Sequence, residues 1–151
     1  MAKKQLKKKK QKEKLSLDKI QKKRGSECEQ YPAFSFRYLT KKKKFNFDFF
    51  RERQEEGNKM FRSLSKKMKE LSEKSYTYWN GIGKEQGGIE TISFWQCKLK
   101  PDELTLPPDE TIIVIRFCQQ KYRLLGVRLD KCPTLHIIGF DFDYSAYNHG
   151  S

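Results

Sequence analysis

The first 24 residues of this 151-residue chain are so rich in lysine that they cannot contribute to a hydrophobic core. They contain eleven lysines and one arginine against Glu13 and Asp18, a net charge of +10 out of the chain's +14. Such a segment buries too little apolar surface to offset its conformational entropy, so we expect residues 1–25 to be a disordered Lys-rich tail. The folded part is then a single domain spanning residues 26–151.

The basic tail predicts a polyanionic partner, because lysines that neutralise phosphates release the counterions bound there. Nucleic acid fits better than a membrane surface: Leu6, Leu15, Leu17 and Ile20 are too sparse for an apolar helix face. No run approaches the roughly 20 apolar residues that span a bilayer, and no apolar stretch follows the basic N-terminus as a secretory signal requires. We therefore expect a cytoplasmic protein that binds nucleic acid and no membrane.

The cysteine pattern does not predict a disulfide framework or a zinc site. Cys28, Cys97, Cys118 and Cys132 form no C-x-x-C pair, and the chain has only two histidines. We expect four reduced thiols, no metal and no cofactor.

The N-terminal half of the domain predicts a β-hairpin followed by one long helix. Aromatic residues alternate with polar ones at 34–38 and again at 45–49, which is typical of half-buried strands, and Lys41–Lys44 would form the hairpin tip. From Gln54 onward, apolar residues recur every three or four positions, as in an amphipathic helix that ends at Asn80–Gly81.

The C-terminal half has the clearest strand pattern. Apolar runs at 111–118, 122–129 and 134–142 are separated by short turns, which indicates an antiparallel meander. A further strand is expected at 91–99, and a loop at 101–109. The predicted fold class is α+β: an antiparallel sheet, made of the N-terminal hairpin and the C-terminal meander, packed on one long helix.

Two residues of the meander and one just after it are candidates for phosphodiester chemistry. Arg116 and Arg123 flank the first turn and could lie on one face of adjacent strands, where a guanidinium pair could hold a phosphodiester and stabilise developing charge. Tyr147 follows the last strand and could transfer a proton or stack on a base. The alternative is that both arginines are ordinary solvated strand residues and that Tyr147 covers a sheet edge.

The segment from Arg116 to Tyr147 resembles the C-terminal sheet of RelE/ParE-type toxins, in which a Tyr-Arg-aliphatic strand turns into an aliphatic strand followed by a Tyr. Here these parts are Tyr122 to Gly126, Leu135 to Ile138, and Tyr147. RelE-like proteins are small and basic and cut messenger RNA on the ribosome without a metal. The resemblance implies a toxin–antitoxin endoribonuclease with Arg116, Arg123 and Tyr147 as catalytic residues, an RNA or ribosome partner and an antitoxin-like protein partner. This chain has Asp141-Phe142-Asp143 where the family places a basic residue.

Two other interpretations remain open. Asp141 and Asp143, two residues apart on a strand, could hold a divalent ion with His136 or His149, as in a metal-dependent nuclease, or could simply cap the strand. The aromatics at 34–38 and 45–49 could stack on unpaired bases, although burial in the core explains them better.

The sequence thus predicts an RNA-binding protein, for which the resemblance suggests a metal-independent ribonuclease activity. The alternative is a non-enzymatic accessory protein anchored to RNA or DNA by its tail. The residues expected to contact nucleic acid are basic ones from the tail, the hairpin tip and one face of the helix: Lys7, Lys8, Lys9, Lys10, Lys41, Lys42, Lys43, Lys44, Arg62, Lys66 and Lys69.

Overall fold

The computed structural model describes residues 30–130 and 132–149. Residues 1–29 lie outside this part, so the predicted disorder of the tail and the predicted contacts of Lys7 to Lys10 lie outside the described residues. Within that part, no helix combines the length and apolar character needed to cross a bilayer.

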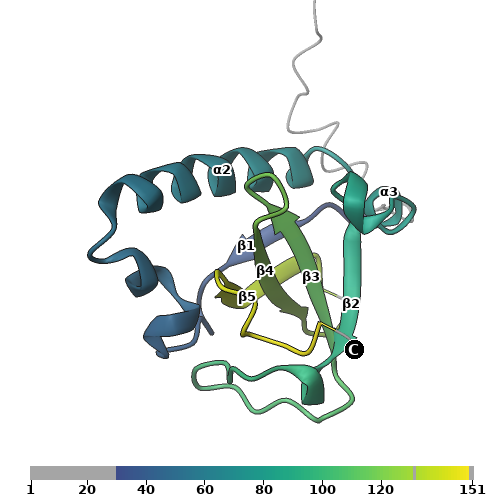
Figure 1. The fold of residues 1–151 in the computed structure, drawn as a ribbon. Helices are drawn as coiled ribbons and strands as arrows, with labels where there is room; N and C mark the ends of the chain where they lie inside the picture. Colours follow the sequence, from purple (N-terminus) through teal and green to yellow (C-terminus); the bar gives the residue numbers. More distant parts are fainter. Residues whose placement is uncertain (1–29, 131, 150–151) are drawn as a thin grey trace, which may run out of the picture.

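A five-stranded sheet with the order β1-β5-β4-β3-β2 forms the centre of the fold (Figure 1). The strands are β1 (Ala33–Ser35), β2 (Ile89–Ser93), β3 (Thr111–Phe117), β4 (Tyr122–Arg128) and β5 (Thr134–Asp141). The predicted meander is confirmed: β3, β4 and β5 pair antiparallel in sequence order, and β2 adds antiparallel to β3. The sheet is nevertheless mixed, because β1 pairs parallel with β5.

The predicted N-terminal hairpin is wrong. Only β1 is extended; the residues expected to form the second strand make two 3₁₀ helices, η1 (Lys43–Phe45) and η2 (Phe47–Phe50). Asn46, between them, accepts a hydrogen bond from the Asp48 backbone N–H at 2.9 Å and donates one to the Thr40 carbonyl at 2.9 Å. This side-chain bonding to the backbone turns the chain where a strand would run straight.

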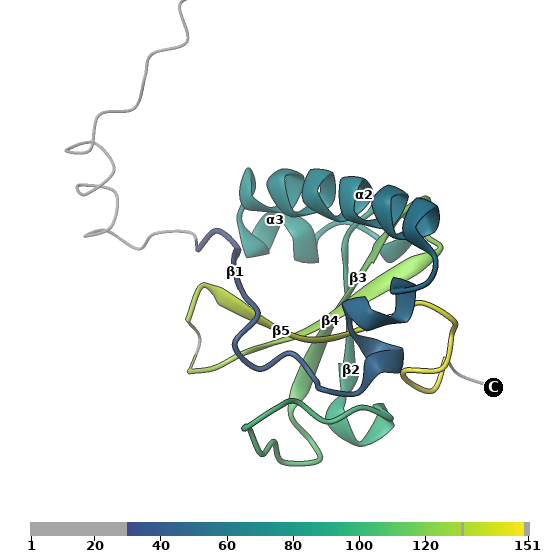
Figure 2. The same ribbon diagram turned by 90° about the vertical axis from the view of Figure 1, so that its left-hand side faces the viewer.

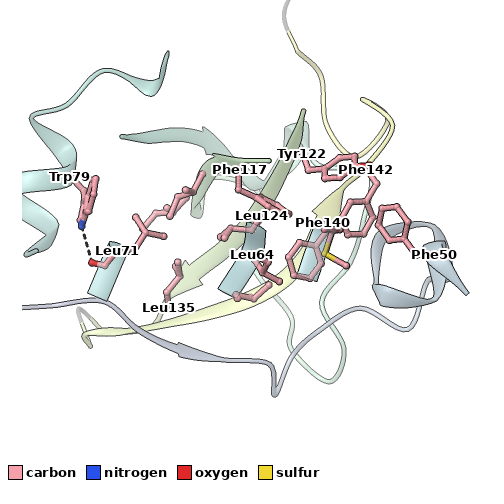
Figure 3. Packing of buried hydrophobic residues seen from close by; sticks show 14 of the residues in the cluster. Phe50, Leu64, Leu71, Trp79, Phe117, Tyr122, Leu124, Leu135, Phe140 and Phe142 are labelled. Atoms are coloured by element: carbon pink, nitrogen blue, oxygen red, sulfur yellow. Dashed lines mark hydrogen bonds between the residues drawn. The ribbon is translucent and has the colours of Figure 1, made fainter. Parts of the chain in front are cut away.

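The predicted long helix is interrupted. Helix α2 (Gln54–Ser72) begins where expected, but the chain leaves helical geometry before α3 (Tyr76–Asn80). Ser75 has extended φ and ψ, and its hydroxyl accepts a hydrogen bond from the Tyr78 backbone N–H, so it acts as the N-cap of α3. Trp79, on α3, donates its indole N–H to the Leu71 carbonyl at 2.9 Å and thereby joins the two helices (Figure 3).

Both faces of the sheet are covered. Figures 1 and 2 show α2 on one side of the strands and the segment that follows β2 on the opposite side. The α2 face is largely aromatic and aliphatic, and Figure 3 shows its packing, with Leu64 of α2 near Leu124 and Phe140. The opposite face carries a second core, which includes Phe45, Leu99, Val114, Leu125 and Tyr147.

The segment that covers the second face contains little regular structure. A short 3₁₀ helix, η3 (Lys84–Gln86), precedes β2, and another, η4 (Phe94–Gln96), follows it. The strand predicted at 91–99 is therefore shorter and begins earlier, while the loop predicted at 101–109 is present. The functional candidates lie at one end of this second face.

Candidate functional site

Arg116 and Arg123 lie directly opposite one another on β3 and β4. Alternation along the strands places both on the face opposite α2, next to Val114 and Leu125 of the second core. Arg123 is only 6% exposed, so it is not the solvated strand residue of the alternative interpretation. Like charges directly opposite each other destabilise a sheet, so this pair needs compensation.

Arg116 is held by two neighbouring groups. Its Nη2 lies 3.8 Å from Oε2 of Glu90 on β2, and its Nη1 donates a hydrogen bond to the Gln120 side chain at 3.3 Å. Gln120 lies in the turn between β3 and β4 and donates its own amide N–H to the Glu85 carbonyl. Glu90 also pairs with Lys84 at 3.3 Å, so a second cation borders the site.

Arg123 has few polar contacts. Its guanidinium lies over the ring of Tyr144, 4.7 Å from the ring centroid, which is a cation–π contact. Its Nε and Nη1 are buried and have no hydrogen-bond partner among the described residues, and the same holds for Nε of Arg116. A buried donor without a partner costs roughly 1–3 kcal/mol, and more when it is charged. Three such donor nitrogens lie on the paired arginines Arg116 and Arg123.

Tyr147 reaches the arginines because the end of the chain folds back onto the sheet. Cys97 and Tyr147 form an antiparallel bridge, and the Lys98 backbone N–H donates to the Ala146 carbonyl at 2.7 Å. Tyr147 is 3% exposed. Burial raises the pKa of its hydroxyl to about 12, with Arg123 and Arg116 acting in the opposite direction. At neutral pH Tyr147 is therefore protonated and can donate a proton, but it cannot act as a base.

Asp141 forms a hydrogen-bonded pair with His149. One carboxylate oxygen, Oδ2, lies 2.8 Å from Nε2 of His149, and the other accepts from the backbone N–H groups of Ser145 and Ala146. The Asp141 side chain is fully buried, whereas that of His149 remains 27% exposed. The imidazole also packs on Tyr147, with 3.9 Å between ring centroids.

Some of these residues, but neither Arg123 nor Asp141, line a polar cavity of about 230 Å³. Its lining includes the two cations Lys84 and Arg116, the carboxylate of Glu90, and the rings of Tyr147 and His149. The volume is below the roughly 300–1,000 Å³ of pockets for drug-sized ligands.

Of the residues of the predicted metal site, Asp141 and His149 lie together, whereas Asp143 and His136 lie elsewhere. Strand β5 ends at Asp141, so Asp143 lies beyond the strand and is exposed. Its carboxylate accepts a hydrogen bond from the Ser145 hydroxyl and forms an ion pair with Lys44. His136 stacks on Tyr38, 5.1 Å between centroids, and is not part of the cluster. Among residues 30–130 and 132–149, no three His, Cys, Asp or Glu side chains gather as a metal ion requires.

The basic residues predicted to contact nucleic acid occupy two separate places. Lys41 to Lys44 are exposed; Lys41 pairs with Asp102 at 3.4 Å and Lys44 with Asp143 at 3.6 Å. Arg62, Lys66 and Lys69 are exposed on α2, across the sheet from the cavity, and Lys69 pairs with Glu73. Among the aromatics of the expected hairpin, Phe45 is buried and Phe36 is 40% exposed. The other four are partly buried and pack against the two cores: Phe34, Tyr38, Phe47 and Phe49.

The three described cysteines form no disulfide. Cys97, Cys118 and Cys132 are unpaired, and Cys28 lies outside the described residues. Burial raises the pKa of the Cys97 thiol to about 12, so it is not a nucleophile at neutral pH.

The sequence pattern indicates Arg116, Arg123 and Tyr147 as site residues, but not Glu90 or Lys84. It indicates His149 only as a metal ligand. No local signal marks Glu90, which reaches the site through the pairing of β2 with β3. No protein-family model, curated protein or solved structure matches this chain.

Proposed function

We propose that this protein binds RNA and cleaves it at a phosphodiester bond without a metal ion, in the manner expected of a RelE-like ribonuclease. The observation that supports this most is the facing pair Arg116 and Arg123, with three buried guanidinium nitrogens unpartnered among the described residues. Proteins leave charged donors unpaired at a cost in stability, and such sites are commonly functional.

Each residue has a distinct role in this proposal. Arg116 and Arg123 bind the non-bridging oxygens of the scissile phosphate and stabilise the charge that develops on them. Tyr147, protonated at neutral pH, donates a hydrogen bond or a proton to the leaving oxygen. Glu90 fixes Arg116 and Lys84 in position.

The lysine-rich segments supply affinity rather than chemistry. The tail and Lys41 to Lys44 contact phosphates along the RNA, a class of contact that is independent of sequence and falls with salt. Lys44 pairs with Asp143, which lies two residues after Asp141 at the end of β5. Asp141 in turn bonds His149 of the cavity, so the lysine stretch and the cavity lie at the same end of the molecule.

The test is a cleavage assay on the full chain with chelator present, using single-stranded RNA and ribosome-bound message. Wild type should cleave at least one of them. Arg123→Lys keeps the charge but loses the planar fork, and should cut at least tenfold more slowly. Arg51→Lys, at an exposed position outside the site, is the matched control and should cut at the wild-type rate.

Two results would redirect the proposal. Binding of RNA with no cleavage of either substrate would leave the non-enzymatic accessory role. Cleavage that stops when chelator is added would instead indicate a metal-dependent nuclease.

A further inference from the structure

We infer that His149, positioned by Asp141, is the general base that deprotonates the ribose 2′-hydroxyl next to the scissile phosphate. This rests on the proposed ribonuclease function and specifies its substrate, because DNA has no 2′-hydroxyl. The main observation behind it is a histidine hydrogen-bonded to a fully buried carboxylate at the rim of a cavity that also contains Arg116.

The hydrogen bond to Asp141 selects one tautomer of the imidazole. With the carboxylate 2.8 Å from Nε2, the neutral ring carries its proton on that nitrogen. Nδ1 is then the acceptor. The lining of the cavity by His149 places this ring where a bound substrate can reach it.

Asp141 is well suited to hold the ring still. Its other oxygen accepts two backbone N–H groups, from Ser145 at 3.0 Å and Ala146 at 3.3 Å. These bonds tie the carboxylate to the segment that also carries Tyr147 and His149. Asp141 acts through His149 and is a positioning residue, and it also stabilises the imidazolium that forms during proton transfer.

The charges around His149 are mixed. The ionisable and charged groups around it are Lys84 of η3, Glu90 of β2, Arg116 of β3, Arg123 of β4, Asp141 of β5, and Tyr144 and Tyr147 of its own segment.

The chemical step balances within these residues. Nδ1 of His149 accepts the 2′-hydroxyl proton, the 2′-oxygen forms a bond to phosphorus, and the bond from phosphorus to the 5′-oxygen breaks. The leaving 5′-oxygen takes a proton from the Tyr147 hydroxyl. The imidazolium then returns its proton to the Tyr147 oxygen, and the products are a 2′,3′-cyclic phosphate and a 5′-hydroxyl.

The experiment compares His149→Ala with wild type on an RNA oligonucleotide and on the same oligonucleotide carrying one 2′-deoxy residue at the cleaved position. The ribosome-bound form is used if only that is cut. Wild type should cut the RNA and not the 2′-deoxy version, although it binds both equally well. His149→Ala should cut RNA about 10²–10⁴-fold more slowly with unchanged binding, and added imidazole should restore part of the rate.

The pH profile separates a chemical from a structural role. The wild-type rate should fall at acid pH as an imidazole is protonated, and this acid limb should disappear in His149→Ala. Asp141→Asn should reduce the rate at least tenfold. His136→Gln, which changes the chain's other histidine, should leave rate and profile unchanged.

The failures are distinguishable. A wild-type chain that cuts neither RNA substrate overturns the proposed function and this inference together. Wild-type cleavage that persists in His149→Ala, or that continues at a 2′-deoxy position, overturns the inference and leaves the proposed function standing.

Discussion

Arg123 of β4 and Asp141 of β5 are direct cross-strand neighbours on the same face of the sheet. The position of Asp141 on this face depends on a β-bulge in β5. The register pairs Leu125 with Gly139 but Gly126 with Ile137, so Ile138 is an extra residue in β5. Without it, alternation would turn Asp141 to the α2 face, where Leu135 and Ile137 point. The bulge therefore brings the carboxylate and its histidine to the arginine side, as bulges near functional sites often do.

The first prediction concerns Gly139, which pairs beside the bulge. A Cβ at this position would lie 2.7 Å from Leu99 Cδ2 and 3.3 Å from the Phe45 carbonyl oxygen. Because Leu99 is buried, Gly139→Ala should lower the free energy of unfolding by about 1–3 kcal/mol. Chemical denaturation measures this. Gly83→Ala, where a Cβ meets nothing within 4 Å, is the control and should change stability little.

The second prediction concerns alkaline pH. Burial raises the pKa of both Tyr76 and Tyr147 to about 12, above the value of about 10 in an unfolded chain. Each tyrosine therefore contributes its full stabilisation below about pH 10 and loses it as the pH rises toward 12. Unfolding free energies measured from pH 9 to 12 should fall less steeply in Tyr76→Phe and in Tyr147→Phe. Slopes equal to wild type in both variants would contradict the burial of these hydroxyls.

The third prediction concerns the stretch Lys41 to Lys44, in which some lysines form ion pairs and others do not. Lys41 and Lys44 pair with carboxylates, whereas Lys42 and Lys43 form no ion pair with any described residue. Changing Lys42 and Lys43 to Gln should weaken RNA binding and reduce the slope of log affinity against log salt by about 0.7 for each phosphate that is no longer neutralised. Fluorescence anisotropy at several salt concentrations measures it. Lys59→Gln with Lys74→Gln is a charge-matched control, and an equal change there would show that only net charge matters.

The fourth prediction concerns the break between the helices. Ser75 is 4% exposed and caps α3 through its bond from the Tyr78 backbone N–H at 3.2 Å. Ser75→Ala should cost about 1 kcal/mol of stability, within the usual range for loss of an N-cap. Ser65→Ala, at an exposed position within α2, is the matched control and should cost nothing. Equal stability of the two variants would argue against the cap.

The sequence predicts the meander closely because its strands are long and apolar and are joined by short turns. Strands β3, β4 and β5 end within one residue of the predicted limits. The hairpin fails because the spacing of Phe45, Phe47 and Phe49 fits two structures. In the 3₁₀ helices, Phe45 packs on the face away from α2 while Phe47 and Phe49 pack toward it. The hydrogen bonds of the Asn46 side chain to the backbones of Thr40 and Asp48 favour the 3₁₀ helices, and the alternation of aromatics does not show them.

Part of the candidate site can be predicted from the sequence, because it depends on the short turn between two strands of the meander. Arg116 and Arg123 flank a short turn, so their pairing follows from the meander alone. The contact of Asp141 with His149 depends on the bulge in β5 and on the return of the chain past Cys97. Neither feature leaves a periodic signal, and the predicted alternation placed Asp141 and Asp143 together instead.

The most direct test of the phosphate site is the NMR signal of the arginine Nε–H groups. Nε of Arg116 and of Arg123 has no hydrogen-bond partner among the described residues. A new hydrogen bond from either Nε–H group to a bound phosphate should therefore change its NMR signal. Titration of the full chain with a short 2′-deoxy-substituted RNA should shift both signals, while the Arg51 signal stays in place. If the RNA binds and the signals of Arg116 and Arg123 do not move, the phosphate lies elsewhere and the account is contradicted.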